Sequence, residues 1–167
     1  MVADARTYTR SLARRRRALY ISSPIGLGHA QRDVAIADEL RKLHPDLDID
    51  WLAQHPVTAV LETHGERIHP LSAELASESA HITAESSGHD LNAFQAIRRT
   101  DEILVNNFMV FQDAVEEGEY DLVVGDEAWD VDHYLHEHPE LKRTAFAWMT
   151  DFVAGCRCPR AATARRT

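Results

Sequence analysis

The sequence predicts an α/β domain of Rossmann-like type, with a doubly wound, mostly parallel sheet and helices on both faces. Short apolar runs typical of strands alternate along the chain with segments of helical periodicity. Most of these runs are apolar throughout, which indicates parallel strands buried on both faces. A glycine-rich turn joins the first run to the first helical segment, as in many open α/β sheets. The chain has 167 residues, 44% of them hydrophobic, which is enough for one such domain.

The first strand, the first helix and the second strand are expected between residues 18 and 54. Ala18–Ser23 is a short apolar run that ends at a proline and a glycine, which are typical boundaries of a buried strand. Apolar residues then recur at near-helical spacing and predict a helix over His29–Leu43, which Pro45 terminates. Asp48–Gln54 is expected to form the second strand.

The middle of the chain predicts a short helix, a short strand, a long loop and a long helical segment. Pro56–His64 suits a helix with proline in its first turn, followed by a third strand at Arg67–Leu71. Ser72–Asp90 is polar and lacks steady periodicity, so we expect a long loop there. Apolar residues of Leu91–Glu117 can share one face, which predicts one long helix or two in series.

The last part of the domain repeats the alternation of strand and helix. Asp121–Gly125 is apolar after its first residue and predicts another buried strand. Asp130–His138 is expected to be a helix, and Thr144–Met149 a final strand. Because helices separate these strands in sequence, the connections favour parallel pairing.

The two ends of the chain differ from this core in composition. Met1–Arg17 contains six arginines but no apolar stretch, so we expect a disordered basic extension rather than a secretory signal. From Ala154 to Thr167 acidic and large apolar residues are absent, and both cysteines, Cys156 and Cys158, occur there. This segment is either a natural disordered tail or coding sequence read out of frame. The predicted domain therefore spans residues 18–153.

The charge of the core argues against nucleic acid as a partner. The formal net charge is −9, but ten of the 18 basic residues lie in the two ends. Ala18–Val153 thus holds eight basic and 26 acidic residues, a balance that repels phosphate backbones. No apolar run approaches the roughly 20 residues of a transmembrane helix. Since the core also lacks cysteine, we expect a cytoplasmic protein without disulfides.

The turn Pro24-Ile-Gly-Leu-Gly-His29 does not match the common nucleotide-binding fingerprints. Gln31 stands where a dinucleotide-binding turn has its third glycine, and the second strand closes at Gln54 instead of an acidic residue. No Gly-Lys-Ser/Thr follows, which argues against a phosphate-binding P-loop. We therefore expect no NAD, FAD or other bound cofactor.

His29 is the strongest candidate for a catalytic residue. At the amino terminus of a helix the dipole favours the neutral imidazole, which can accept a proton as a general base. Such a base needs a carboxylate that sets its tautomer and stabilises the imidazolium. Asp126 directly follows the strand Asp121–Gly125, so it should lie at the same edge of the sheet. The alternatives are that His29 only fills the turn or caps the helix, and that Asp126 caps the helix after it.

Two segments resemble those of GT-B-fold glycosyltransferases that use nucleotide sugars. Pro24-Ile-Gly-Leu-Gly-His29 resembles their amino-terminal signature, and Val123-Val-Gly-Asp-Glu-Ala-Trp129 resembles a later strand that ends in aspartate. The resemblance covers roughly Ala18–Val153. In inverting members that glycosylate small molecules, the histidine deprotonates the acceptor hydroxyl and the aspartate supports it; by position these are His29 and Asp126. The Gly-x-Gly-His motif is shared with peptidoglycan lipid-linked N-acetylglucosaminyltransferases.

The resemblance implies one half of a GT-B fold, the half that binds the acceptor. The family binds its nucleotide-sugar co-substrate mainly in a second, carboxyl-terminal domain, so we expect this chain to be a truncated glycosyltransferase. Its acceptor would be a small molecule or a lipid-linked one. Gly26 and Gly28 would let the acceptor approach the backbone, and Arg32 and Trp129 are further candidates for substrate binding. A non-catalytic fragment that only binds an acceptor is the alternative.

A metal-dependent hydrolase is the second alternative. Asp130, Asp132, His133 and His136 are residue types that ligate metals, and the two histidines can share a helix face. The compact His-Glu-x-x-His signature is absent, however, and a solvated helix face explains the same pattern. We therefore expect no metal site.

Overall fold

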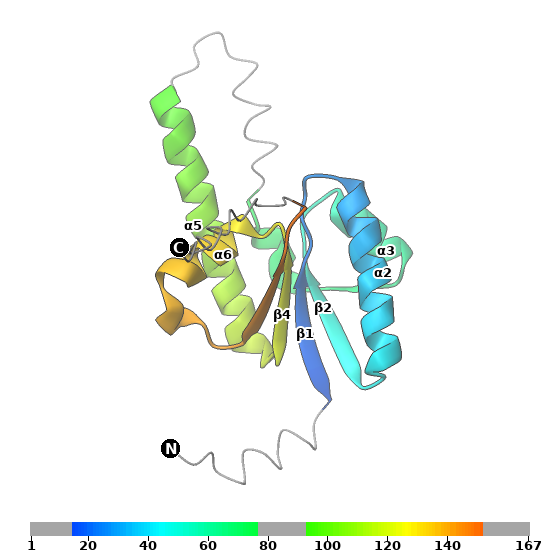
Figure 1. The fold of residues 1–167 in the computed structure, drawn as a ribbon. Helices are drawn as coiled ribbons and strands as arrows, with labels where there is room; N and C mark the ends of the chain where they lie inside the picture. Colours follow the sequence, from blue (N-terminus) through cyan, green and yellow to red (C-terminus); the bar gives the residue numbers. More distant parts are fainter. Residues whose placement is uncertain (1–14, 77–92, 152–167) are drawn as a thin grey trace, which may run out of the picture.

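The structure is a computed structural model that describes residues 15–76 and 93–151, a five-stranded sheet with helices on both faces (Figure 1). Its strands are β1 (Arg16–Ile21), β2 (Leu47–Leu52), β3 (Arg67–Ile68), β4 (Leu122–Asp126) and β5 (Ala145–Met149). Its helices are α2 (Leu27–Leu43), α3 (Val57–Thr63), α5 (Ala93–Gly118) and α6 (Trp129–Glu137), with 3-10 turns η1 (Pro70–Glu74) and η2 (Pro139–Leu141). Every pair of neighbouring strands is parallel, which confirms the predicted Rossmann-like α/β class.

The first strand begins earlier than the sequence predicts. β1 starts at Arg16, so the last two residues of the expected basic extension belong to the sheet. The reason is a tertiary contact: the Arg17 guanidinium lies 2.7 Å from the Asp50 carboxylate of β2. Asp50 also accepts hydrogen bonds from Arg67 and from the Tyr120 hydroxyl. Burial alone would raise the pKa of Asp50, but these three donors together lower it.

Other boundaries also differ. The long helical segment, expected as one helix or two in series, is the single helix α5. The third strand has two residues, because Pro70 begins η1 where the strand was expected to continue. The remainder of the expected extension, the loop beyond residue 76 and the tail fall at residues 1–14, 77–92 and 152–167, outside the described residues.

The strand order is β3-β2-β1-β4-β5. The chain moves outward from β1 to β3 and then returns to the other side of β1, where β4 pairs with it. In open parallel sheets, ligands bind beyond the carboxyl ends of the strands at the point where this direction reverses. The topology therefore predicts a ligand site at the ends of β1 and β4.

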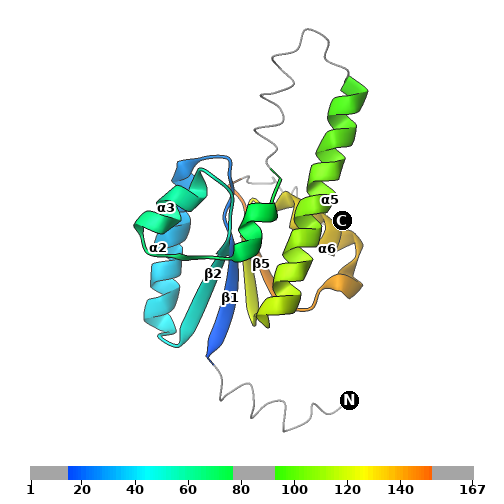
Figure 2. The same ribbon diagram turned by 180° about the vertical axis from the view of Figure 1, so that it is seen from behind.

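Successive strand residues face opposite sides of the sheet and form two cores. One core packs under α2 and α3, and the other under α5 and α6; Figure 2 shows the two layers from behind. The Tyr20 and Trp51 rings stack in the first core, with centroids 4.4 Å apart. This burial on both faces explains why the strands are apolar throughout. The first core includes Tyr20, Trp51, Val124, Val34 and Leu61, and the second includes Leu19, Leu52, Val123, Phe111 and Leu135.

Asp33 attaches the start of α2 to the end of β1. Its buried carboxylate accepts hydrogen bonds from the Ser22 hydroxyl at 2.5 Å and the Tyr20 hydroxyl at 3.2 Å. Burial raises the pKa of Asp33 to about 6, and the negative charge of Asp126 acts in the same direction. The first two turns of α2 are thus held in a defined position over the sheet.

We expect Asp33 to make the stability of the protein depend on pH. The folded protein binds this proton at a higher pH than the unfolded chain does, since the pKa rises from 3.8 to about 6. Its contribution to the free energy of unfolding is therefore largest below the unfolded value and decreases as the pH rises through 6. In urea unfolding, the free energy of unfolding of wild type should decrease relative to that of Asp33→Asn from pH 4 to pH 7. A difference that does not change over this range would contradict the assignment.

Leu61→Ala should lower the free energy of unfolding by about 2–5 kcal/mol, because Leu61 on α3 is fully buried against the sheet and its loss leaves a cavity. Leu43→Ala is the matched control. Leu43 at the end of α2 is 73% exposed, and its removal should change stability by less than about 0.5 kcal/mol. Urea unfolding at neutral pH measures both variants, and similar losses would refute this description of the core.

Candidate functional site

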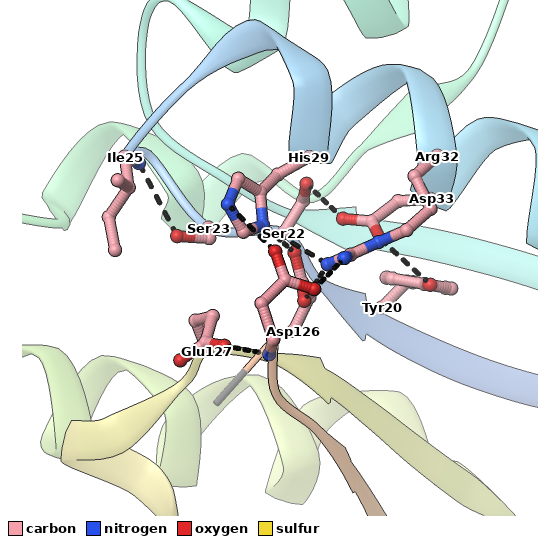
Figure 3. A network of polar contacts seen from close by, with 10 residues as sticks. Tyr20, Ser22, Ser23, Ile25, His29, Arg32, Asp33, Asp126 and Glu127 are labelled. Carbon is pink, nitrogen blue, oxygen red and sulfur yellow. Dashed lines mark hydrogen bonds and ion pairs between the residues drawn. The ribbon is translucent and has the colours of Figure 1, made fainter. Parts of the chain in front are cut away.

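The candidate site lies where β1 leads into α2 and β4 ends, at the reversal point of the sheet (Figure 3). After β1 the chain turns through Ser22, Ser23 and Pro24, and α2 begins at Leu27, two residues earlier than predicted. His29 therefore lies in the first turn of α2, and its backbone N–H donates to the Gly26 carbonyl at 3.1 Å. Asp126 is the last residue of β4.

The structure brings His29 and Asp126 into direct contact. The distance from His29 Nδ1 to Asp126 Oδ2 is 2.7 Å, and Asp126 is fully buried while the His29 side chain is 18% exposed. A carboxylate can only accept, so Nδ1 carries the hydrogen and donates it to Asp126. In this tautomer Nε2 carries no hydrogen, and its lone pair takes no part in the contact with Asp126. Nε2 lies 3.7 Å from Asp151 Oδ2, beyond hydrogen-bonding distance.

Arg32 supports this pair from one turn further along α2. Its guanidinium donates to Asp126 Oδ1 and to Asp151 Oδ1, and it passes 3.1 Å from His29 Nδ1. Burial would lower the pKa of Arg32, but its interactions with the two aspartates raise it. The sequence predicts Arg32 as a substrate-binding residue; the structure places its charge against Asp126 and Asp151.

The two glycines of the turn face open space. A Cβ atom added to Gly26 or Gly28 would meet no atom within 4 Å. Gly26 has an extended backbone, φ −173°, which any residue can adopt. Neither conformation nor internal packing therefore requires glycine here. The turn leaves room in front of the amino terminus of α2, as an approaching ligand would need.

A cavity of about 140 Å³ adjoins Asp126. Its walls come from the ends of β1, β2 and β4, from α5, and from the start of α6. Trp129 lines it, is 45% exposed, and packs edge-on against Trp148 with ring centroids 4.7 Å apart. The apolar lining includes Ile21, Ile25, Leu52 and Leu75, and the polar lining includes Gln54, Asn107, Asp126, Glu127 and Asp130.

Three acidic residues lie at this site that the sequence did not place there, although Asp130 was considered as a possible metal ligand. Glu127 follows Asp126 and is 6% exposed, with its Oε1 accepting from the Asp151 backbone N–H at 2.5 Å. Asp130 lines the cavity, and burial raises its pKa. The only available signal for Glu127 was its place beside Asp126. Asp151 carried no signal, because it lies 25 positions beyond Asp126 and reaches the site after β5.

The α6 residues that were considered as possible metal ligands are not brought together. His133 and His136 are exposed, and His133 Nε2 lies 3.8 Å from Glu137, one turn along the same helix. Asp130 instead lines the cavity. Across residues 15–76 and 93–151, no three His, Cys, Asp or Glu side chains form a group that could hold a metal ion. Within the same ranges no helix is both long and apolar enough to cross a bilayer.

Comparisons with known proteins do not identify the chain. It matches no family model, and no curated protein sequence matches it. The resemblance to GT-B glycosyltransferases consequently stays a prediction from the two motifs.

Proposed function

We propose that the protein takes part in the transfer of a sugar from a nucleotide-sugar donor to an acceptor hydroxyl, with inversion at the anomeric carbon. His29 is the general base and Asp126 the residue that orients it. The observation that carries this proposal is the 2.7 Å contact between His29 Nδ1 and the fully buried Asp126 carboxylate. It leaves Nε2 as a proton acceptor at the edge of the sheet.

The proposed step is a single displacement. Nε2 of His29 takes the proton of the acceptor hydroxyl while its oxygen forms a bond to the anomeric carbon. The bond from that carbon to the nucleotide phosphate breaks, and the nucleotide leaves with the electron pair. Asp126 stabilises the imidazolium that forms, because its negative charge lies against the protonated Nδ1. A single displacement on one carbon inverts its configuration.

The surroundings of His29 support an acceptor site. The open space at Gly26 and Gly28 allows close approach, and the adjoining cavity combines apolar walls with a few polar groups, as small-molecule sites do. Trp129 offers a half-exposed ring at its rim. We place the acceptor here and expect the donor to bind in a second domain. The alternative, an acceptor-binding protein without catalysis, would use the same cavity without His29.

His29→Ala should reduce the rate of transfer by about 10²–10⁴-fold, the usual contribution of a positioned general base. Transfer is measured in a protein that includes the donor-binding domain, as release of nucleotide from a panel of nucleotide sugars mixed with hydroxylated acceptors. His44→Ala, which removes an exposed histidine at the end of the same helix, is the control and should leave the rate unchanged. Wild-type turnover by His29→Ala would refute the proposed role.

Asp126→Asn should lower kcat by a similar factor but change acceptor affinity only slightly. An amide can donate to Nδ1 and so favours the tautomer that carries its hydrogen on Nε2, which cannot accept a proton. Rate and acceptor affinity are measured separately, by turnover and by titration calorimetry. An unchanged kcat in Asp126→Asn would contradict the orienting role. If wild type and Asp126→Asn bind the acceptor equally well and wild type shows no turnover with the donor-binding domain present, the non-catalytic alternative is favoured.

A further inference from the structure

Glu127 is buried beside the proposed site with part of its hydrogen-bonding capacity unused. It lines the cavity and is 6% exposed, yet its Oε2 has no partner among the residues that the structure describes. Its φ of 49° lies in the left-handed region, where residues other than glycine are strained. Such strain persists where the surrounding structure imposes it, and it is frequent at functional sites.

The charges that line the cavity are all negative. Asp126, Glu127 and Asp130 contribute carboxyl groups, and no Lys, Arg or His is among the lining residues. Asp126 is neutralised by Arg32. Asp130 accepts from the Val131 N–H at 2.9 Å and from Asn107, but neither it nor Glu127 forms an ion pair within the described part of the chain.

The two buried polar atoms of the lining that have no hydrogen-bond partner are both acceptors. Gln54 lines it, and its Nε2 donates to the Ala76 carbonyl at 3.0 Å, which fixes the orientation of the amide. Its Oε1 is buried and has no described partner. An occupant that suits this lining must bring hydrogen-bond donors, and a positive charge would offset the buried Glu127 carboxylate.

We propose that this cavity binds a protonated amine carried on a single six-membered ring, with the ammonium group held by Glu127. An ammonium has three donors and no acceptor, which matches the unused atoms of Glu127 and Gln54. The volume of about 140 Å³ is close to that of cavities of roughly 150 Å³ that hold benzene. The apolar walls at Ile21, Leu52 and Leu75 would contact the ring.

This inference rests on the proposed function only in giving the amine the role of acceptor. The amino group would sit at Glu127, and a hydroxyl of the same molecule would reach His29. A neutral hydroxyl at Glu127 donates once and leaves the carboxylate charge uncompensated. The cavity should therefore prefer an amine over the matching alcohol.

The test compares pairs of ligands that differ in one group. Cyclohexylamine and cyclohexanol, and glucosamine and glucose, are titrated into the full chain at pH 7 and followed by calorimetry and NMR. Each amine should bind at least about tenfold more tightly than its alcohol, as expected for one additional charge-assisted hydrogen bond. Equal affinity within a pair, or no binding of the amines, would overturn the proposal even without any variant.

Glu127→Gln should remove this preference, weakening the amine about tenfold or more and changing the alcohol less than about twofold. Glu137→Gln is the matched control, because it makes the same charge change at an exposed position of α6 that does not line the cavity. Circular dichroism checks that both variants fold, and Asp130→Asn supplies a second variant of the lining. Retention of the preference by Glu127→Gln would refute the assignment. Binding of Ca²⁺ or Mg²⁺ alone would also refute the assignment if it depends on Glu127 and displaces the amine.

The two proposals can fail separately. Amines that bind through Glu127 but accept no sugar, even with the donor-binding domain present, would support this inference and contradict the transfer reaction. Sugar transfer that depends on His29 but shows no preference for amine-bearing acceptors, and no amine binding, would do the reverse.

Discussion

The site depends on one buried charge, the Asp126 carboxylate at the end of β4. A carboxylate with no exposed surface is costly unless it is paired and hydrogen-bonded. Both of its oxygens are satisfied from α2, Oδ2 by His29 and Oδ1 by Arg32. The start of α2 must therefore lie over the end of β4, and Arg32 also draws in Asp151 after β5. Three segments distant in sequence meet around this one group.

The pairing of Asp126 also determines which atoms of the site can act on a ligand. His29 Nδ1 and the terminal nitrogens of Arg32 are engaged with carboxylates of the protein itself. His29 Nε2 and Glu127 Oε2 form no hydrogen bond with the described residues. Two adjacent acidic residues thus differ in kind: Asp126 is neutralised internally, whereas Glu127 is buried without a cation among the described residues. This difference in environment, rather than in residue type, underlies the two proposed roles.

Much of the fold could be predicted from the sequence because its signals are local. Apolar runs and helical periodicity located the strands and helices, and parallel connectivity placed His29 and Asp126 at the same edge of the sheet. The prediction was wrong for the start of β1, where Arg17 looks like part of a basic extension. Its partner Asp50 lies 33 positions away, so composition could not reveal the contact. The third strand was also too long in the prediction, because η1 starts at Pro70.

The sequence by itself determined the α/β class, the order of the elements and the identity of the two residues at the centre of the site. These follow from periodicity and from glycine, proline and histidine at strand ends, which are properties of short segments. Only the tertiary structure decided that Arg32 pairs with Asp126 and Asp151, and that Glu127 is buried in a cavity with no cation among its lining residues. Burial and pairing depend on which distant segments the fold brings together. The chemical role of a charged side chain is determined by that environment.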